Sequence, residues 1–262
     1  MTDAHEFLLA YDEQLRTDAE TPGAIAQKRL GPLRLVRFAS GRGFVTYQPP
    51  RGIDAQRMAQ LVRPSLDHYR QTPEITRVEW KTRGHDRVPG LHEALVGNAF
   101  EPDEQESIMI GRAQLLDVTV PLSKGVTLRK VRDEADVRAM TVMEDVAFAS
   151  DMSDALTLAL LRRLALNGGM ELWVAEADGQ IISAGRLEPV AGTEFAGIWG
   201  GATLHAWRGR GIYRALTAAR ARSALAKGKT LIHSDSSDYS RPILERAGLV
   251  KVSTTTPYCW HR

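Results

Sequence analysis

The chain has 262 residues, of which 43% are hydrophobic and 25% are charged, a composition typical of a globular protein and not of a disordered or membrane-spanning one. Its formal net charge is +2 and its arginines are scattered, so charge gives no argument for a nucleic-acid partner. Cys259 is the only cysteine, which excludes a disulfide within the chain and a cysteine-based metal cluster. No apolar run approaches the length of a membrane span and no apolar signal region follows Met1, so we expect a cytoplasmic protein without a membrane partner.

Apolar periodicity and turn residues define the elements expected in the first part of the chain. Residues 40–43 look like a hairpin turn between two short strands, and Pro49 and Pro50 end the second strand. We expect helices over residues 4–17, 53–69 and 91–96, and strands over residues 33–38, 43–47, 77–80 and 107–116.

Residues 118–125 are the expected linker, because Pro121, Ser123 and Gly125 interrupt the apolar periodicity there. Beyond it the pattern restarts, with Asp133 as a helix N-cap and a hairpin across Asp178-Gly179. We expect strands over residues 126–131, 171–177, 180–189, 193–204, 230–234 and 251–260, and helices over residues 133–148, 154–166, 212–227 and 240–247.

The most informative stretch is the basic, glycine-containing turn at residues 208–213, which lies between a strand and a helix. Its two glycines allow the backbone to approach a ligand closely. The helix that follows directs its first unpaired N–H groups, and the positive end of its dipole, toward the turn. Together with Arg208, Arg210 and Arg214, this arrangement predicts a site for a phosphate-bearing ligand. The alternative is an ordinary strand–turn–helix corner with surface arginines.

Two familiar phosphate loops do not fit this turn. The third glycine of a dinucleotide-binding G-x-G-x-x-G turn is replaced by Arg214, and no G-x-x-x-x-G-K-[ST] string occurs. The turn instead resembles the acyl-CoA loop R/Q-x-x-G-x-G/A of the GCN5-related N-acetyltransferases (GNAT), with Tyr213 at the place of the final small residue. The order of elements after residue 125 is similar to that family too, and Gly248-Leu249 stands where the family commonly has Gly-Phe.

The resemblance implies an α+β fold of the GNAT type, a mixed and mostly antiparallel sheet flanked by helices, in two tandem domains. We expect a degenerate GNAT-like domain over residues 1–117, the linker over 118–125, and the acyl-CoA-binding domain over 126–262. The first half echoes the later part of the fold but lacks the R-x-x-G-x-G loop at residues 48–53, so an unrelated α+β domain is the alternative there.

The resemblance also implies site residues. In the family, backbone N–H groups of the strand before the basic turn polarise the thioester carbonyl, and a tyrosine on the last helix protonates the thiolate. That tyrosine position is Leu244 here, and Tyr239 is the nearest phenol, so Tyr239 is the candidate catalytic residue, with a structural role as the alternative. The residues expected to contact acetyl-CoA are Ala202, Thr203, Arg208, Gly209, Arg210, Gly211, Ile212 and Tyr213.

No general base stands out. Gly197 occupies the family's position for a catalytic Glu, Glu194 lies three residues earlier, and Asp235 and Asp238 follow the next strand as solvated loop acids or ligand-binding ones. An ordered water chain is the other alternative. His205, His233 and His261 lack metal-ligand spacing, so we expect no metal. The serines at 234–240 lack a G-x-S-x-G elbow.

We therefore expect an N-acetyltransferase that moves an acetyl group from acetyl-CoA to a primary amine of a small molecule or peptide. A non-catalytic acyl-CoA-binding regulatory module is the alternative, and a homodimer is left open. The acceptor's identity does not follow from the sequence.

Overall fold

The computed structural model describes residues 3–48 and 55–262, and it divides into two compact units. The first unit consists of the described residues of Met1–Met109 together with Asp235–Pro242 and Lys251–Arg262. The second consists of Ile110–Ser234 and Ile243–Val250. The units thus interleave along the chain, and the residues expected to form a linker at 118–125 lie within the second. The domain boundaries given by the sequence stay a prediction.

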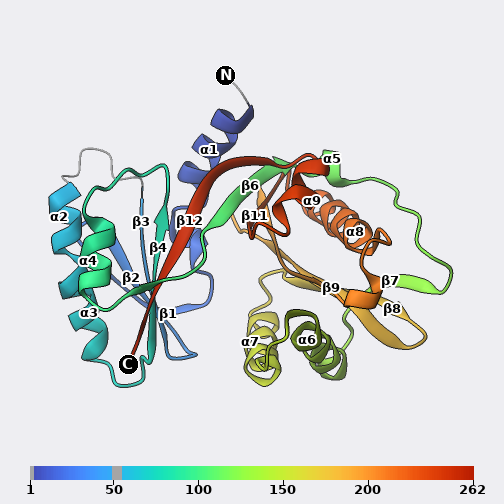
Figure 1. The fold of residues 1–262 in the computed structure, drawn as a ribbon, viewed down its shortest axis with the longest axis horizontal. Coiled ribbons are helices and arrows are strands. Elements are labelled where there is room, and N and C mark those ends of the chain that lie inside the picture. The colour runs from blue at the N-terminus through green and yellow to red at the C-terminus, as the bar shows by residue number, and fades with distance from the viewer. Residues whose placement is uncertain (1–2, 49–54) are drawn as a thin grey trace. The chain divides into compact units, whose positions relative to one another are not determined.

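The first unit is built on a sheet with the strand order β1-β2-β3-β4-β12 (Figure 1). All neighbours are antiparallel except β3 and β4, and short β5 pairs with β12. The strands are β1 (Ala24–Leu30), β2 (Leu33–Phe38), β3 (Arg42–Tyr47), β4 (Arg77–Arg83), β5 (Glu101–Pro102) and β12 (Val250–His261), and the helices are α1 (Asp3–Gln14), α2 (Ala55–Gln60), α3 (Val62–Arg70) and α4 (Leu91–Gly97).

The core of this unit lies between the sheet and helices α2, α3 and α4. Trp80 of β4 packs edge-on against Phe100, with ring centroids 6.3 Å apart. Tyr258 and Trp260 of β12 belong to the same buried cluster. The last strand of the chain therefore completes the core that the first hundred residues begin.

Two expectations for this part of the chain need correction, and one strand was missed. The single helix expected over 53–69 is two helices with a break at Leu61, because Pro64 has no N–H to donate to the carbonyl of Gln60. β1 was not expected, because its residues are largely exposed and carry no apolar alternation. The strand expected over 107–116 ends at Arg112, after which a short helix begins. The expected loop at residues 48–53 falls mostly on residues 49–53, which lie outside the described ranges.

The second unit is built on a sheet with the strand order β11-β10-β9-β8-β7, antiparallel except between β10 and β11. β6, β11, α9 and β12 each contribute residues to both units. The strands are β6 (Glu106–Arg112), β7 (Val126–Lys130), β8 (Glu171–Ala177), β9 (Gln180–Pro189), β10 (Phe195–Thr203) and β11 (Leu231–Ser236), and the helices are α5 (Ala113–Leu116), α6 (Glu134–Phe148), α7 (Ser153–Ala165), α8 (Ile212–Ala226) and α9 (Arg241–Arg246).

The helices of the second unit cover its sheet on both faces (Figure 1). Val174 of β8 belongs to the cluster with α6 and α7, whereas the next residue, Ala175, belongs to the cluster with α8, as expected for side chains that alternate across a strand. The Asp133 side chain accepts the N–H of Asp136 at 2.9 Å, so its expected N-cap role is confirmed. The Asp178-Gly179 turn is confirmed too, with positive φ at both residues.

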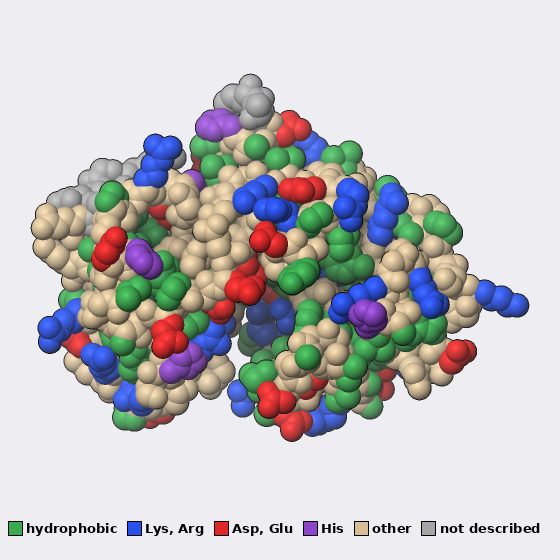
Figure 2. Space-filling model, viewed as in Figure 1, with side chains coloured by type: hydrophobic (Ala, Val, Ile, Leu, Met, Phe, Trp, Pro, Cys, Tyr) green, Lys and Arg blue, Asp and Glu red, His purple; other side chains and the backbone are tan. Residues whose placement is uncertain are grey.

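On the face drawn in Figure 2, acidic and basic side chains are interspersed with hydrophobic ones. Among residues 3–48 and 55–262, no helix is long and apolar enough to cross a membrane.

Candidate functional site

The β10 strand is irregular at the point where it approaches the basic turn. Trp199 faces Arg186 of β9 and Ala202 faces Ala184, so Gly200 and Gly201 together oppose the single residue Gly185. This is a β-bulge, which leaves main-chain groups out of the ladder. On its other side, β10 pairs with β11 only from Phe195 to Gly197, although β10 runs on to Thr203.

Each glycine at this bulge leaves room for a larger side chain. A Cβ on Gly185 would overlap the guanidinium of Arg220, and a Cβ on Gly201 would overlap the ring of Tyr213. Gly200, with φ of +59°, faces the carboxylate of Glu144 and the guanidinium of Arg186 instead. The bulge is therefore a fixed feature around which side chains from α6, α8 and β9 are arranged.

The basic turn follows β10 after one turn of 3-10 helix, His205–Trp207. Residues 208–211 are exposed, and Gly209 and Gly211 have φ values of +74° and +77°. Gly211 is the N-cap of the 15-residue helix α8, so no side chain caps the first N–H groups of that helix. A Cβ on Gly209 would meet nothing within 4 Å. The turn thus presents these N–H groups without a side-chain cap, an arrangement that can accept an anion.

The arginines of the turn do different things. Arg208 donates from Nε to the carbonyl of Thr203 at 3.0 Å and from Nη2 to the carbonyl of Ala147 at 3.1 Å. Because Ala147 lies in the last turn of α6, the guanidinium caps a carbonyl group at the end of that helix. Arg210 stacks on Trp207, with its Cζ 4.8 Å from the ring centroid, and Arg214 is exposed. Arg208 therefore ties the turn to β10 and α6, which leaves Arg210 and Arg214 as the arginines of this turn that can face a ligand.

Ala202 and Thr203, the expected contacts for the thioester carbonyl, come directly after the bulge and pair with β9. Ser183 Oγ donates to the carbonyl of Ala202 at 2.6 Å and lies 2.8 Å from Thr203 Oγ1. Tyr213 lies against Gly201, and Arg220 lies 6.0 Å from its ring centroid. The predicted residues of β10, the turn and α8 are thus brought together in the second unit.

Glu144 is a buried carboxylate beside the bulge that sequence reasoning did not find. Its residue is 3% exposed, and an added Cβ on Gly200 would lie 3.4 Å from its Oε1. Burial is the main cause that raises its pKa, to about 7, with a further rise from the charge of Asp145, while Arg186 opposes the shift. Because α6 carries many acidic residues, nothing in the sequence distinguished Glu144 from those on its exposed side. The pair Gly200-Gly201 inside a strand was the available signal for the bulge.

Tyr239 is 92% exposed and lies in a segment that belongs to the first unit, whereas the basic turn belongs to the second. Leu244, at the family's tyrosine position, is buried in the core of the second unit. The other acids considered have structural partners. Lys81 Nζ lies 2.7 Å from Asp235, Thr230 Oγ1 donates to Glu194 at 3.2 Å, and Asp238 lies 3.4 Å from Arg241.

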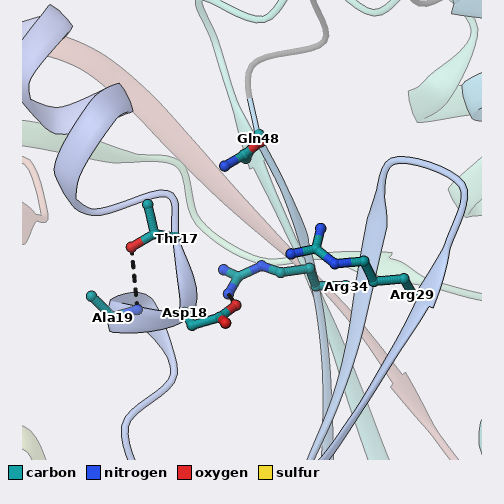
Figure 3. A pocket seen from close by; sticks show the side chains of 6 residues that line it. All are labelled: Thr17, Asp18, Ala19, Arg29, Arg34 and Gln48. Atoms are coloured by element: carbon teal, nitrogen blue, oxygen red, sulfur yellow. Dashed lines mark hydrogen bonds and ion pairs between the residues drawn. The ribbon is translucent and has the colours of Figure 1, made fainter.

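A separate pocket of about 250 Å³ opens in the first unit (Figure 3). In it, buried Arg34 donates to Asp18 at 2.8 Å and to Glu20 at 3.1 Å, so its charge is compensated. We interpret these ion pairs as structural, holding the residues before β1 against β2. The pocket is lined by Thr17, Asp18, Ala19, Arg29, Arg34 and Gln48. Within the described ranges, no group of His, Cys, Asp and Glu is placed to hold a metal ion.

Comparison with known proteins gives a consistent result at the level of structure. No family model matches the sequence, and no curated protein does. A GCN5-related N-acetyltransferase from Kribbella flavida matches with a TM-score of 0.68 over 99% of this chain and 96% of that one, at 18% identity. A tandem GNAT protein from the clavulanic acid biosynthesis pathway matches with 0.62, over 99% and 96%, at 13% identity. A GCN5-related N-acetyltransferase from Sphaerobacter thermophilus matches with 0.61, over 88% and 76%, at 16% identity.

At such identities the likeness concerns the fold. The chain has the fold of the GCN5-related N-acetyltransferases, and the expected α+β class, a mixed and mostly antiparallel sheet flanked by helices, is confirmed.

Proposed function

We propose that the chain is an N-acetyltransferase that binds acetyl-CoA in its second unit and transfers the acetyl group to a primary amine. The proposal rests on three features that follow one another along the chain. The bulged strand β10 leads into the exposed basic turn, and the turn leads into the uncapped N-terminus of α8. Such a strand and turn suit a ligand that joins a reactive acyl group to a pyrophosphate.

The chain's own residues divide the work. The N–H groups at the start of α8, with Arg210 and Arg214, hold the pyrophosphate, and charge-assisted hydrogen bonds of this kind contribute about 1.5–3 kcal/mol each. Backbone N–H groups around the bulge, at Ala202 and Thr203, orient the carbonyl. Tyr239 is our proposed proton donor. Bound acetyl-CoA supplies an activated acetyl group, and the amine attacks it directly while both reactants are held in line.

We further propose that the acceptor is a small molecule or peptide with a primary amine. The first unit then serves structure or acceptor recognition. The folds of the neighbours support an acyltransferase, and the tandem neighbour supports a two-domain reading of the whole length.

The test is release of free thiol from acetyl-CoA by the purified full chain, with a panel of primary amines that includes amino acids, an aminoglycoside and a short peptide. We expect thiol release that depends on the amine, together with an acetylated product seen by mass spectrometry. CoA affinity is measured in parallel by calorimetry. Binding of CoA without amine-dependent thiol release would instead favour the regulatory module.

A further inference from the structure

Glu144 is as buried as a core residue, but it carries an ionisable carboxyl group. It lies on α6 and is 3% exposed, among the residues that pack α6 against β9 and β10. Within the described part of the chain its Oε1 is buried and has no hydrogen-bond partner. Taking a carboxylate out of water without a partner is costly, so a buried unpaired oxygen calls for an explanation.

The nearest charged groups do not provide that explanation. Arg186 of β9 flanks Gly200 from the same side as Glu144, but it lies 3.5 Å from Glu188. Glu188 in turn accepts Arg163 Nη2 at 2.7 Å. Asp145, next to Glu144 on the helix, is directed to Ser150 and to the N–H groups of residues 152 and 153. The charge of Arg186 is therefore shared between Glu188 and Glu144, and Oε1 of Glu144 accepts no hydrogen bond from it.

The oxygen lies beside the bulge of β10. It would lie 3.4 Å from a Cβ on Gly200, whose φ of +59° and missing side chain bring the backbone of the bulge close to α6. A group bound at the bulge would therefore lie beside the carboxylate of Glu144, with the guanidinium of Arg186 also close. A buried carboxylate is stabilised by a hydrogen-bonded cation, and a primary ammonium is such a partner.

We propose that Glu144 receives the ammonium group of the acceptor beside the β10 bulge and takes the proton from it, a role that rests on the proposed acetyltransferase function. The raised pKa of its carboxyl group suits this task, because a general base works best when its pKa is close to the working pH.

One proton of the R–NH₃⁺ group passes to Oε1 of Glu144 and leaves an amine with a free electron pair. That pair forms the new C–N bond at the thioester carbonyl carbon, and the C–S bond breaks with its electrons on sulfur. The surplus proton on nitrogen is lost, and sulfur takes up one proton from the donor. The products are an amide, a free thiol and one proton, which Glu144 returns to solvent.

The test compares Glu144→Gln, which keeps the shape and removes the base, with Glu134→Gln on the exposed side of the same helix. We expect Glu144→Gln to lower kcat/KM at pH 7 by about 10²-fold or more, and to abolish the acidic limb of the pH profile with its midpoint near 7. Affinity for CoA is expected to stay within about twofold, because the carboxylate faces the acceptor. Glu134→Gln, which loses an exposed ion pair with Arg138, is expected to match the wild type.

A second readout does not depend on turnover. In protein labelled with ¹³C at the glutamate carboxyl carbon, one resonance should titrate near pH 7 and be missing from Glu144→Gln. The fastest amine of the panel, added without acetyl-CoA, should lower that midpoint. Glu144→Asp, which keeps a carboxylate, provides the assignment if Glu144→Gln does not fold.

The outcomes separate the two proposals. Wild-type turnover and an unchanged pH profile in Glu144→Gln, or a resonance that the amine does not move, would overturn the role of Glu144 and leave the acetyltransferase proposal standing. A wild-type protein that releases no thiol with any amine would overturn both.

Discussion

Gly201 is required at its position by the ring of one neighbour, Tyr213, which lies where a Cβ would be. The family pattern has a small residue at position 213, so the tyrosine and the glycine form a matched pair in this chain. Glycine pairs of this kind are visible in a sequence, but the side chain that fills the vacated space is not.

This pairing predicts a coupled effect on stability. Gly201→Ala is expected to lower the free energy of unfolding by about 1–3 kcal/mol, because the added methyl group overlaps the Tyr213 ring. In a Tyr213→Ala background the same substitution should cost less than half as much. Urea unfolding of the four proteins of this double-mutant cycle measures the coupling. Equal costs in the two backgrounds would contradict the contact.

Glu144 should give the stability of the protein a characteristic pH dependence. Its pKa is raised from 4.5 to about 7 in the folded chain, so between those values the folded state holds a proton that the unfolded state has lost. The free energy of unfolding therefore falls as pH rises through this window, by about 3 kcal/mol for the shift of this one group. Glu144→Gln should remove that part of the slope. The free energy of unfolding of both proteins is measured by denaturant unfolding at pH 4.5, 5.5, 6.5 and 7.5. The same pH dependence in wild type and Glu144→Gln would refute the raised pKa.

Tyr239→Phe tests the proposed proton donor. A phenol that protonates the leaving sulfur contributes about 10²–10⁴-fold in rate, so turnover should fall by at least about 10²-fold while CoA affinity holds. The tyrosine is 92% exposed, so its removal should leave stability unchanged. A fall in turnover of less than about threefold would place the donor elsewhere, with water as the alternative.

At the scale of elements, the turn before α8 allows a matched comparison, because two glycines at the two ends of that helix have similar positive φ values. Gly211 at its start has φ of +77° and Gly228 just after its end has φ of +73°. Gly211→Val should lower affinity for CoA at least about tenfold, because a branched side chain blocks approach to the first N–H groups of the helix. Gly228→Val carries a similar backbone penalty away from the turn and should bind CoA as the wild type does. Calorimetry measures the affinity of both folded variants for CoA. Equal CoA affinities of the two variants would refute the assignment of the site to this turn.

The second half of the chain was predicted well from sequence because its signals are local. Asp133 as an N-cap, the Asp178-Gly179 turn and the basic turn each depend on residues a few positions apart. β1 was not predicted, because an exposed polar strand has no apolar alternation. The break at Leu61 was not predicted either, because Pro64 was interpreted as part of a single helix.

The site was less predictable than the fold. The basic turn lies between β10 and α8 as expected, but the contact of Arg208 with α6 depends on Ala147, which lies 61 residues away in the sequence. Glu144 was missed for the same reason. Its burial comes from packing between α6 and the sheet, and no pattern within α6 marks it.

At the scale of the molecule, the first unit has its own core and lacks the loop pattern R-x-x-G-x-G. We therefore expect each chain to bind one CoA, at residues 208–213, where Arg208 and Gly211 match the pattern and Tyr213 replaces its final small residue. The two prolines at 49 and 50 remove N–H donors where the first half would need its cradle. Calorimetric titration of the full chain with CoA should give a stoichiometry near one. A value near two would contradict the degenerate reading of residues 1–117.

β12 is the last strand of the sequence, yet it pairs with β4 and places Tyr258 and Trp260 in the core of the first unit. During synthesis at about 5–20 residues per second, β4 waits roughly 10–35 seconds for this partner. For that time the earliest part of the protein has an open strand edge and an incomplete apolar core on the ribosome. A chain whose synthesis stops before residue 250 would therefore lack the strand that completes the core of the first unit, although most of that unit is made first.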